Sequence, residues 1–295
     1  MTSLRSSGAT LRVGQRELRW GERTYVMGVI NMTPDSFSGD GLGRDVDAAV
    51  ERALAFEQEG ADLIDVGGQS TRPAGRVYGP GAPVVSPDEE AERVVPLIRR
   101  LASALGGRVP ISIDTFRAEV AREAVAAGAA LINDVWGLQR DPKLAHVAAE
   151  HGVPLVLMHN QEGYAYRDLL ADVTASLRRS VQQAAAAGVP PDQIIVDPGI
   201  GFGKGAAQSL ELLRRLNEFK AALGRPVLVG TSRKSHIGEV LGGLPAQERL
   251  EGTAATVALA IAKGADIVRV HDVKAMARVA RVADAVVRGW QRPHP

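Results

Sequence analysis

Eight short, β-rich apolar runs alternate with longer stretches of helical character from Tyr25 onward, and this alternation limits the possible folds more than any other feature. Strands regularly followed by helices predict parallel strands joined by helical crossovers. The expected strands begin at Tyr25, Leu63, Val109, Ala130, Pro154, Ile194, Pro226 and Asp266. The expected helices cover residues 45–59, 87–105, 117–127, 143–151, 168–187, 209–223, 247–263 and 273–290.

Eight strand-then-helix units within about 250 residues match a closed (β/α)8 barrel, the TIM-barrel fold. A doubly wound open sheet is the alternative, but no GxGxxG motif follows the first strand to open a helix. The first 24 residues contain LRV and ELRW around a Gly-Gln turn, which predicts a hairpin over the amino-terminal mouth of the barrel. We therefore expect a hairpin extension over residues 1–24 and a single catalytic barrel domain over residues 25–295.

The composition excludes several kinds of chemistry. Because the chain has no Cys, it has no disulfide, no iron–sulfur cluster, no thiolate zinc site and no cysteine nucleophile. Its net charge of +1 creates no overall field that attracts nucleic acid or anionic lipid. The longest apolar stretch, Ala254 to Ala262, is about half of the ~18 residues that suggest a membrane-spanning helix. We expect a soluble, cytoplasmic protein that binds small molecules and neither nucleic acid nor a membrane.

Polar residues follow the carboxyl ends of the expected strands, where barrel enzymes have their active sites. A single Asp after a strand is more often a helix cap, but here all eight strand ends contribute polar groups. Asp65 is the weakest candidate, because an acidic residue within a strand can form a buried ion pair inside the barrel. The polar set is Asn31, Asp65, Ser70, Thr71, Arg72, Asp114, Asn133, Asp134, His159, Asp197, Arg233, Lys234, Ser235, Arg269 and His271.

Glycine-rich segments also follow several strands. The segment GIGFGKG at 199–205 lacks the GxxxxGK[ST] spacing of a phosphate loop. Two longer loops, 32–43 and 70–86, are rich in Gly, Pro and Ser and too irregular for simple turns. Long loops at a catalytic mouth act as lids or binding loops, so we expect both to close over a bound ligand.

These motifs together resemble the dihydropteroate synthase family. Two segments resemble the signature segments of that family, GVINMTPDSFSGDG at 28–41 and DLIDVGGQSTRPAG at 62–75. Its later motifs have counterparts in the correct order, namely SIDTFR, INDVWG, DPGIGFGK, GTSRKSHIG and RVHDV. The resemblance implies an enzyme of folate biosynthesis that joins 6-hydroxymethyl-7,8-dihydropterin diphosphate to p-aminobenzoate and is a target of sulfonamides. It also implies that diphosphate leaves before the amine attacks.

The same resemblance implies which residues bind the pterin and the aminobenzoate. Asp114, Asn133 and Asp197 hydrogen-bond the pterin edge, since carboxylates and an amide complement its ring donors. Met158 and Phe202 pack on the ring faces. Pro73 and Arg72 help to build the aminobenzoate pocket, and Ser235, at the start of a helix, anchors the aminobenzoate carboxylate.

The residues implied at the reacting centre and the diphosphate are cationic or polar. The expected catalytic residues are Lys234, Arg269, His271 and Arg72, with Thr71 as a further substrate ligand. Asn31 is the expected protein ligand of a Mg2+ cofactor, which also relies on substrate phosphates and water for coordination.

Two departures from the family pattern flank the site. The chain reads LMHNQEG where relatives often read LMHMQG, and GAAQS follows GFGK where many relatives have a His-Asn pair. We therefore assign no role to His159 or Lys204. Homodimerisation is typical of the family, and the helices expected at 247–263 and 273–290 offer apolar faces for it.

Two other functions stay open at the level of sequence. Pterin-binding methyltransferases share the barrel and the pterin site, but they do not need the TSRKS and STRP segments that this chain contains. A pterin-binding paralogue without activity is the second alternative. The intact set of polar positions argues against it. Measuring diphosphate release from the pterin substrate with and without p-aminobenzoate distinguishes such a paralogue from an active enzyme.

Overall fold

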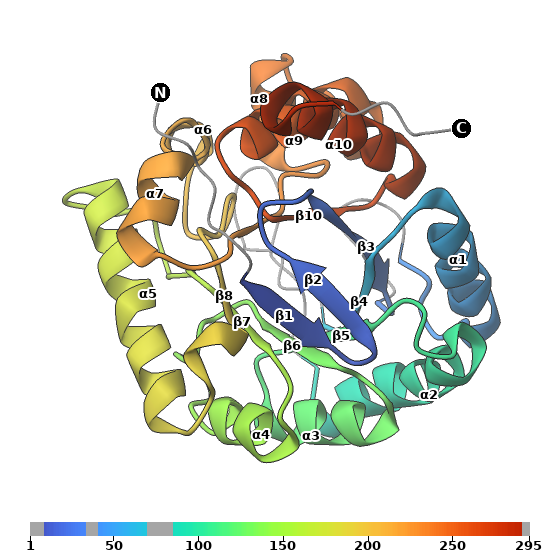
Figure 1. The fold of residues 1–295 in the computed structure, drawn as a ribbon. Helices are drawn as coiled ribbons and strands as arrows, with labels where there is room; N and C mark the ends of the chain where they lie inside the picture. Colours follow the sequence, from blue (N-terminus) through green and yellow to red (C-terminus); the bar gives the residue numbers. More distant parts are fainter. Residues whose placement is uncertain (1–8, 34–40, 70–84, 291–295) are drawn as a thin grey trace.

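The computed structural model describes residues 9–33, 41–69 and 85–290 of the 295-residue chain. Within them, eight parallel strands lie in the order β8-β7-β6-β5-β4-β3-β10-β9, with helices around the outside (Figure 1). A parallel bridge between Val196 and Val227 joins β8 to the residue before β9, so the sheet closes into the predicted barrel. The strands are β3 (Tyr25–Asn31), β4 (Leu63–Gly67), β5 (Ile111–Asp114), β6 (Leu131–Asp134), β7 (Leu155–Met158), β8 (Ile194–Asp197), β9 (Leu228–Val229) and β10 (Ile267–Val270).

Helices follow the strands in the expected alternation, and local capping explains several of their ends. The Asp45 carboxylate accepts a hydrogen bond from the amide of Ala48 at the start of α1, and the Ser86 hydroxyl caps α2 through Glu89. The helices are α1 (Val46–Glu59), α2 (Pro87–Leu105), α3 (Ala118–Ala127), α4 (Leu144–His151), α5 (Leu169–Ala186), α6 (Ala206–Arg214), α7 (Leu216–Leu223), α8 (Ser235–Val240), α9 (Leu250–Ala262) and α10 (Val273–Arg288), with short 3-10 turns η1 (Pro191–Gln193) and η2 (Ala246–Glu248).

The helix expected over residues 209–223 was wrong in its extent. It begins earlier, at Ala206, and is divided into α6 and α7 at Arg215, whose backbone leaves the helical region. The Arg215 guanidinium pairs with Glu211 on one side of the break and Glu218 on the other, which stabilises the junction. None of the described helices combines the length and the apolar character needed to cross a membrane.

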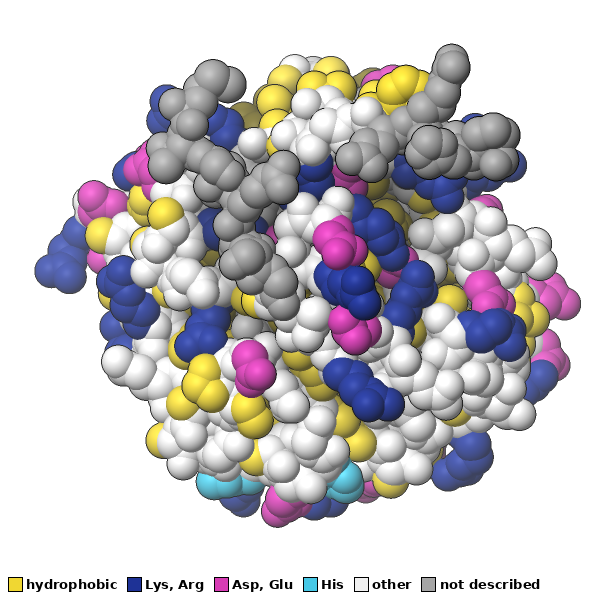
Figure 2. All heavy atoms as spheres, in the orientation of Figure 1, with side chains coloured by type: hydrophobic (Ala, Val, Ile, Leu, Met, Phe, Trp, Pro, Cys, Tyr) yellow, Lys and Arg dark blue, Asp and Glu magenta, His cyan; other side chains and the backbone are white. Residues whose placement is uncertain are grey.

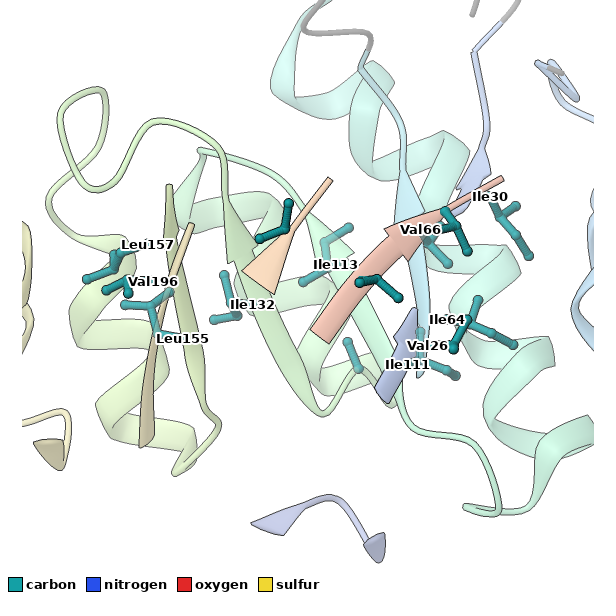
Figure 3. Close-up of a cluster of buried hydrophobic side chains, with 14 of the residues drawn as sticks. Val26, Ile30, Ile64, Val66, Ile111, Ile113, Ile132, Leu155, Leu157 and Val196 are labelled. Atoms are coloured by element: carbon teal, nitrogen blue, oxygen red, sulfur yellow. The ribbon is translucent and has the colours of Figure 1, made fainter. Parts of the chain in front are cut away.

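The outward-facing strand residues form one hydrophobic core with the helices. Gly28 belongs to this layer, because a Cβ atom there would come within 2.7 Å of the Phe56 ring of α1, so glycine allows α1 to pack closely on β3. Figure 3 shows part of this layer, in which side chains from six strands gather at one interface. They include Val26, Ile30, Ile64, Val66, Ile111, Ile113, Ile132, Leu155, Leu157 and Val196.

A second, smaller core lies inside the barrel. The antiparallel hairpin of β1 (Thr10–Val13) and β2 (Arg16–Arg19) crosses one end of the barrel (Figure 1). Its buried side chains pack against inward residues near the strand starts, so it covers the amino-terminal mouth as expected. The division into an extension of 1–24 and one domain of 25–295 stays a prediction. This inner core contains Leu11, Val13, Leu18, Trp20, Tyr25, Met27, Leu63, Leu131, Val156, Ile195, Leu228 and Ile267.

Ion pairs hold the hairpin in place. The Asp62 carboxylate, which directly precedes β4, accepts hydrogen bonds from Arg16 at 2.8 Å and from Arg23 at 2.6 Å. Because the Asp62 side chain is nearly buried, these bonds satisfy a charge that would otherwise be costly to bury. The hairpin is therefore fixed by both apolar packing and electrostatics.

Truncating the hairpin's buried leucine is expected to destabilise the whole barrel. Leu18 is fully buried in the inner core, so Leu18→Ala should lower the free energy of unfolding by about 2 to 5 kcal/mol, as measured by urea denaturation. The neighbouring exposed residue provides the control, and Glu17→Ala should stay within about 0.5 kcal/mol of wild type. Equal stability of the two variants would show that the hairpin is not part of the barrel's cooperative core.

Candidate active site

Along four of the strands, an apolar side chain that points into the barrel is followed two residues later by a polar one. Side chains two residues apart point to the same face of a strand, so the polar groups lie directly above the apolar inner core. They face the carboxyl end of the barrel, where barrel enzymes bind their substrates. The four steps are Leu63 to Asp65, Leu131 to Asn133, Ile195 to Asp197 and Ile267 to Arg269.

Arg269 is the centre of this polar layer. Its Nε donates to Asp65 Oδ2 at 2.6 Å, and its Nη2 donates to Asp114 Oδ2 at 2.8 Å. Asn133 Nδ2 donates to the same Asp65 oxygen at 3.0 Å, which leaves the side-chain amide oxygen of Asn133, Oδ1, to accept from a ligand. Asp65 therefore forms the buried ion pair that its position within a strand suggested.

Burial changes the ionisation of the groups in this layer. It raises the pKa of Asp114 to about 7, although the charge of Arg269 acts in the opposite direction. It raises the pKa of Asp197 and lowers the pKa of Lys234 to about 8, and the attraction between these two groups opposes both shifts. The site is thus a poorly hydrated environment that disfavours the charged forms of both its acids and its lysine.

The loop after β8 brings the expected pterin residues together. Asp197 Oδ1 accepts from the amide of Gly199 at 2.7 Å, and Met158 pairs in register with Asp197. The Lys234 ammonium lies 4.5 Å from the centre of the Phe202 ring and donates to the carbonyl of Ile200. A carboxylate, a thioether, an aromatic ring and a cation therefore surround one place in the barrel mouth.

Lys234 is positioned by a strained neighbour. Arg233 has a φ of 58°, which is unfavourable for a residue with a Cβ atom. Two hydrogen bonds to the Asp272 carboxylate, at 2.9 and 2.6 Å, stabilise it in this conformation. Ser235 then begins α8, as expected. The sequence assigned no role to this arginine–aspartate pair, because the two residues are 39 positions apart and meet only in the closed barrel.

The remaining expected residues of the rim lie at the ends of β3 and β10. Asn31 and Asp114 flank Gly67 across the sheet in direct register, so their side chains occupy neighbouring places. The buried His271 has its Nδ1 2.9 Å from the hydroxyl of Ser232. Thr71, Arg72 and Pro73 lie outside the described residues, as do most of the two long loops expected to close over the ligand.

The apolar floor and the buried carboxylates beside cations form a polar site at the carboxyl end of a barrel, where barrel enzymes bind their substrates. The comparisons identify the class of enzyme. The family described as pterin binding enzyme matches residues 27–271. The dihydropteroate synthase of Bacillus subtilis strain 168 is 53% identical over 270 residues, covering 92% of this chain and 91% of that protein.

Solved structures resemble the whole barrel. A dihydropteroate synthase from Clostridium difficile, determined in the presence of pteroic acid, has a TM-score of 0.83 at 46% identity and covers 91% of this chain and 98% of its own. The Yersinia pestis enzyme in complex with a sulfonamide drug has a TM-score of 0.87 at 38% identity, covering 95% and 100%. This chain belongs to the pterin binding enzymes and, within them, to the dihydropteroate synthase family. It is a transferase of folate biosynthesis that forms a carbon–nitrogen bond.

The raised pKa of Asp114 predicts a specific dependence of stability on pH. In the folded protein Asp114 keeps its proton up to about pH 7, whereas in the unfolded chain it loses it near pH 4. Its contribution to the free energy of unfolding is therefore complete below about pH 4 and is lost as the pH rises through about 7. Wild type should lose stability relative to Asp114→Asn across this range in urea denaturation. Parallel pH profiles for the two proteins would contradict this assignment.

Proposed function

We propose that the polar layer of the barrel binds the pterin of 6-hydroxymethyl-7,8-dihydropterin diphosphate and that the surrounding rim binds the diphosphate and p-aminobenzoate. The observation that carries this proposal is the convergence of Asp114, Asn133 and Asp197 inside the barrel, beside Arg269 and Lys234. A pterin offers an amino group and ring N–H donors, and buried acceptors can match them as a set.

Each pterin contact follows from the chemistry of its residue. Asp114 and Asp197 accept from the ring donors. The side-chain oxygen of Asn133, Oδ1, accepts beside them, because its Nδ2 is the atom bonded to Asp65. Met158 and Phe202 pack on opposite faces of the ring. Lys234, which lies over Phe202, is then close to the pterin and the reacting carbon. Dihydropteroate synthase inhibition by sulfonamides is expected at the neighbouring aminobenzoate subsite, built from Pro73, Arg72 and Ser235.

The reaction separates charge, and the cationic rim stabilises it. The bond between the pterin methylene carbon and the diphosphate oxygen breaks, the electron pair leaves with the diphosphate, and positive charge spreads into the pterin. The aminobenzoate nitrogen then forms the new carbon–nitrogen bond and loses a proton. Arg269, His271, Arg72 and Thr71 stabilise the departing anion, and Lys234 acts close to the reacting carbon.

The end of β3 fits a role in holding Mg2+. Asn31 offers an amide oxygen, the hard type of ligand that Mg2+ prefers, and it lies with Asp114 around Gly67 at the carboxyl end of β3. One protein oxygen is sufficient when substrate phosphates and water complete the shell. When bound, the ion neutralises charge on the diphosphate.

The pterin residues and the leaving-group residues should respond differently to substitution. Asp197→Asn puts a donor where a ring donor needs an acceptor, so the affinity for 6-hydroxymethylpterin should fall about 5- to 150-fold in calorimetry. Arg269→Ala should reduce the rate of diphosphate release at saturating substrate more than it reduces pterin affinity. Wild-type pterin affinity in the first variant, or full turnover in the second with Mg2+ present, would refute the corresponding role. Diphosphate release by wild type, with dihydropteroate formed once p-aminobenzoate is added, supports the whole scheme over a non-catalytic pterin binder.

We also propose that the enzyme is a cytoplasmic homodimer. Large apolar side chains are exposed on α9 and α10, namely Leu259, Val282 and Val286, and Val286 is 80% exposed. The two helices pack against each other, and Figure 2 shows hydrophobic side chains gathered over this side of the molecule. A two-fold interface buries such a patch against its own copy, which removes apolar surface from water on both subunits. A chain without Cys is compatible with a reducing compartment.

The dimer proposal predicts the effect of a charge on α10. Val286→Asp should shift the enzyme from dimer to monomer in light scattering at micromolar concentration, because two like charges would face each other across the two-fold axis. Tyr164→Asp changes another exposed hydrophobic residue, 53% exposed and distant from α10 in sequence, and should leave the dimer intact. A Val286→Asp protein with the same mass as wild type would place the interface elsewhere.

A further inference from the structure

The buried residues His159 and Lys204 have no part in the reaction described above. They follow β7 and β8, and they are 3% and 4% exposed. Lys204 Nζ lies 2.8 Å from His159 Nδ1, donates to the Phe202 carbonyl at 2.8 Å, and is within 3.4 Å of the His159 carbonyl. One lysine side chain therefore joins the β7 loop to the β8 loop, and burial lowers the pKa of its amino group to about 7.

The ionisation of His159 suits this contact. Burial lowers the pKa of His159 to about 3, and the positive charge of Lys204 acts in the same direction. The ring is therefore neutral, its Nδ1 accepts the hydrogen bond from Lys204, and its hydrogen is on Nε2. The other charged groups that act on the pair are Arg179 and Asp172 beside His159, and Asp197 and Lys234 beside Lys204.

The two loops approach so closely that glycine is required at their contact. Gly199 has a φ of 69°, and a Cβ atom there would overlap the carbonyl oxygen of His159. Gly203, with a φ of 57°, would bring a Cβ atom within 2.5 Å of the carbonyl oxygen of Gln161. The loop after β8 is therefore shaped against the loop after β7, and Lys204 is one of the polar groups that join them.

The contact has a direct path to the pterin site. Lys204 holds the main-chain carbonyl of Phe202, and the Phe202 ring lies under the Lys234 ammonium at 4.5 Å. Lys234 also donates to the carbonyl of Ile200 in the same loop. A shift of this loop would move an aromatic face and a cation of the site together.

We propose that Lys204 is a positioning residue for pterin binding, which fixes the loop of residues 199–205 against His159 so that Phe202 and Lys234 are pre-organised around the pterin ring. The inference rests on the proposed pterin contact of Phe202. Pre-organisation lowers the cost of ordering these side chains when the ligand binds.

Other hydrogen bonds keep the loop folded without Lys204. The Gly199 amide is bonded to Asp197, the Gly201 amide to the Ser209 hydroxyl at 3.2 Å, and the Gly203 carbonyl accepts from the Tyr166 hydroxyl at 2.8 Å. None of these bonds involves the Phe202 carbonyl. Loss of Lys204 should therefore make the Phe202 ring more mobile and leave the barrel folded.

A double-mutant cycle tests the proposal. Lys204→Met removes the ammonium and keeps an apolar side chain of similar length, and Phe202→Ala removes the ring through which Lys204 is argued to act. Affinity for 6-hydroxymethylpterin is measured by calorimetry for both single variants and for the double variant. We expect a loss of about tenfold in Lys204→Met, a loss in Phe202→Ala, and little further loss in the double variant. The value of kcat at saturating substrate should change less than KM for the pterin substrate in Lys204→Met.

Controls separate this role from general stability. Lys220→Met removes another lysine that pairs with a buried carboxylate, Asp266, before β10, and it should lower thermal stability without changing pterin affinity. His159→Phe removes the Nδ1 acceptor and keeps Lys204. It should reproduce the selective loss, and it serves as the test if Lys204→Met does not fold.

Three results would overturn the inference. They are wild-type pterin affinity in both Lys204→Met and His159→Phe, losses that simply add in the double variant, or an equal loss in Lys220→Met. Phe202→Ala with unchanged pterin affinity would instead refute the proposed contact of Phe202 itself. A normal loss in Phe202→Ala with no effect at Lys204 would refute the positioning role alone.

Discussion

The ion pairs of Arg269 with Asp65 and Asp114 are the interaction on which the rest of the site depends. Three carboxylates, Asp65, Asp114 and Asp197, face the interior of one barrel, and like charges in a poorly hydrated space would repel strongly. Arg269 compensates two of them, and the positive charge of Lys234 lowers the pKa of the third, Asp197, against the effect of burial. Breaking a buried pair costs about 3 to 5 kcal/mol, so a carboxylate without its cation would stay in the interior only by taking up a proton. Burial raises the pKa of Asp114 to about 7 even beside Arg269, so the pairing and the proton compete at this position.

The environment of these pairs is set by parts of the fold that do not touch a substrate. The hairpin closes the floor of the barrel with Leu18 and Trp20, and the inner apolar core lies immediately beneath the polar layer. Water is thereby excluded from below, which strengthens each electrostatic contact above. In the proposed mechanism, the same exclusion would protect a cationic pterin intermediate from capture by water. Hairpin, inner core and polar layer are consecutive levels of one stack along the barrel axis.

Periodic features could be predicted from the sequence, and contacts between distant loops could not. The eight strands, the hairpin and the polar strand ends follow from local alternation and from turn residues, and the structure confirms them. The break of the expected helix at Arg215 is a local change of backbone angles within a stretch whose residues all favour helix, so the sequence pattern does not reveal it. The sequence assigns no role to Lys204, because the residues after it depart from the family pattern. Its bond to His159, 45 positions away, exists only because β7 and β8 are neighbours in the barrel.

The hydrogen bonds of Arg269 give a physical reason for pterin binding and leaving-group stabilisation to be coupled. Its Nη2 is held by Asp114, and Asp114 is also an acceptor that the pterin edge needs in the proposed complex. Donors of the pterin ring therefore compete with Nη2 for the same carboxylate, while the Nε bond to Asp65 keeps the guanidinium at the site. A guanidinium released from Asp114 in this way has its free N–H groups beside the anion that arrives with the pterin. In the proposed complex, binding of the ring and stabilisation of the diphosphate would thus be coupled through one carboxylate, so the cation would reach the leaving group only when the correct ring is in place.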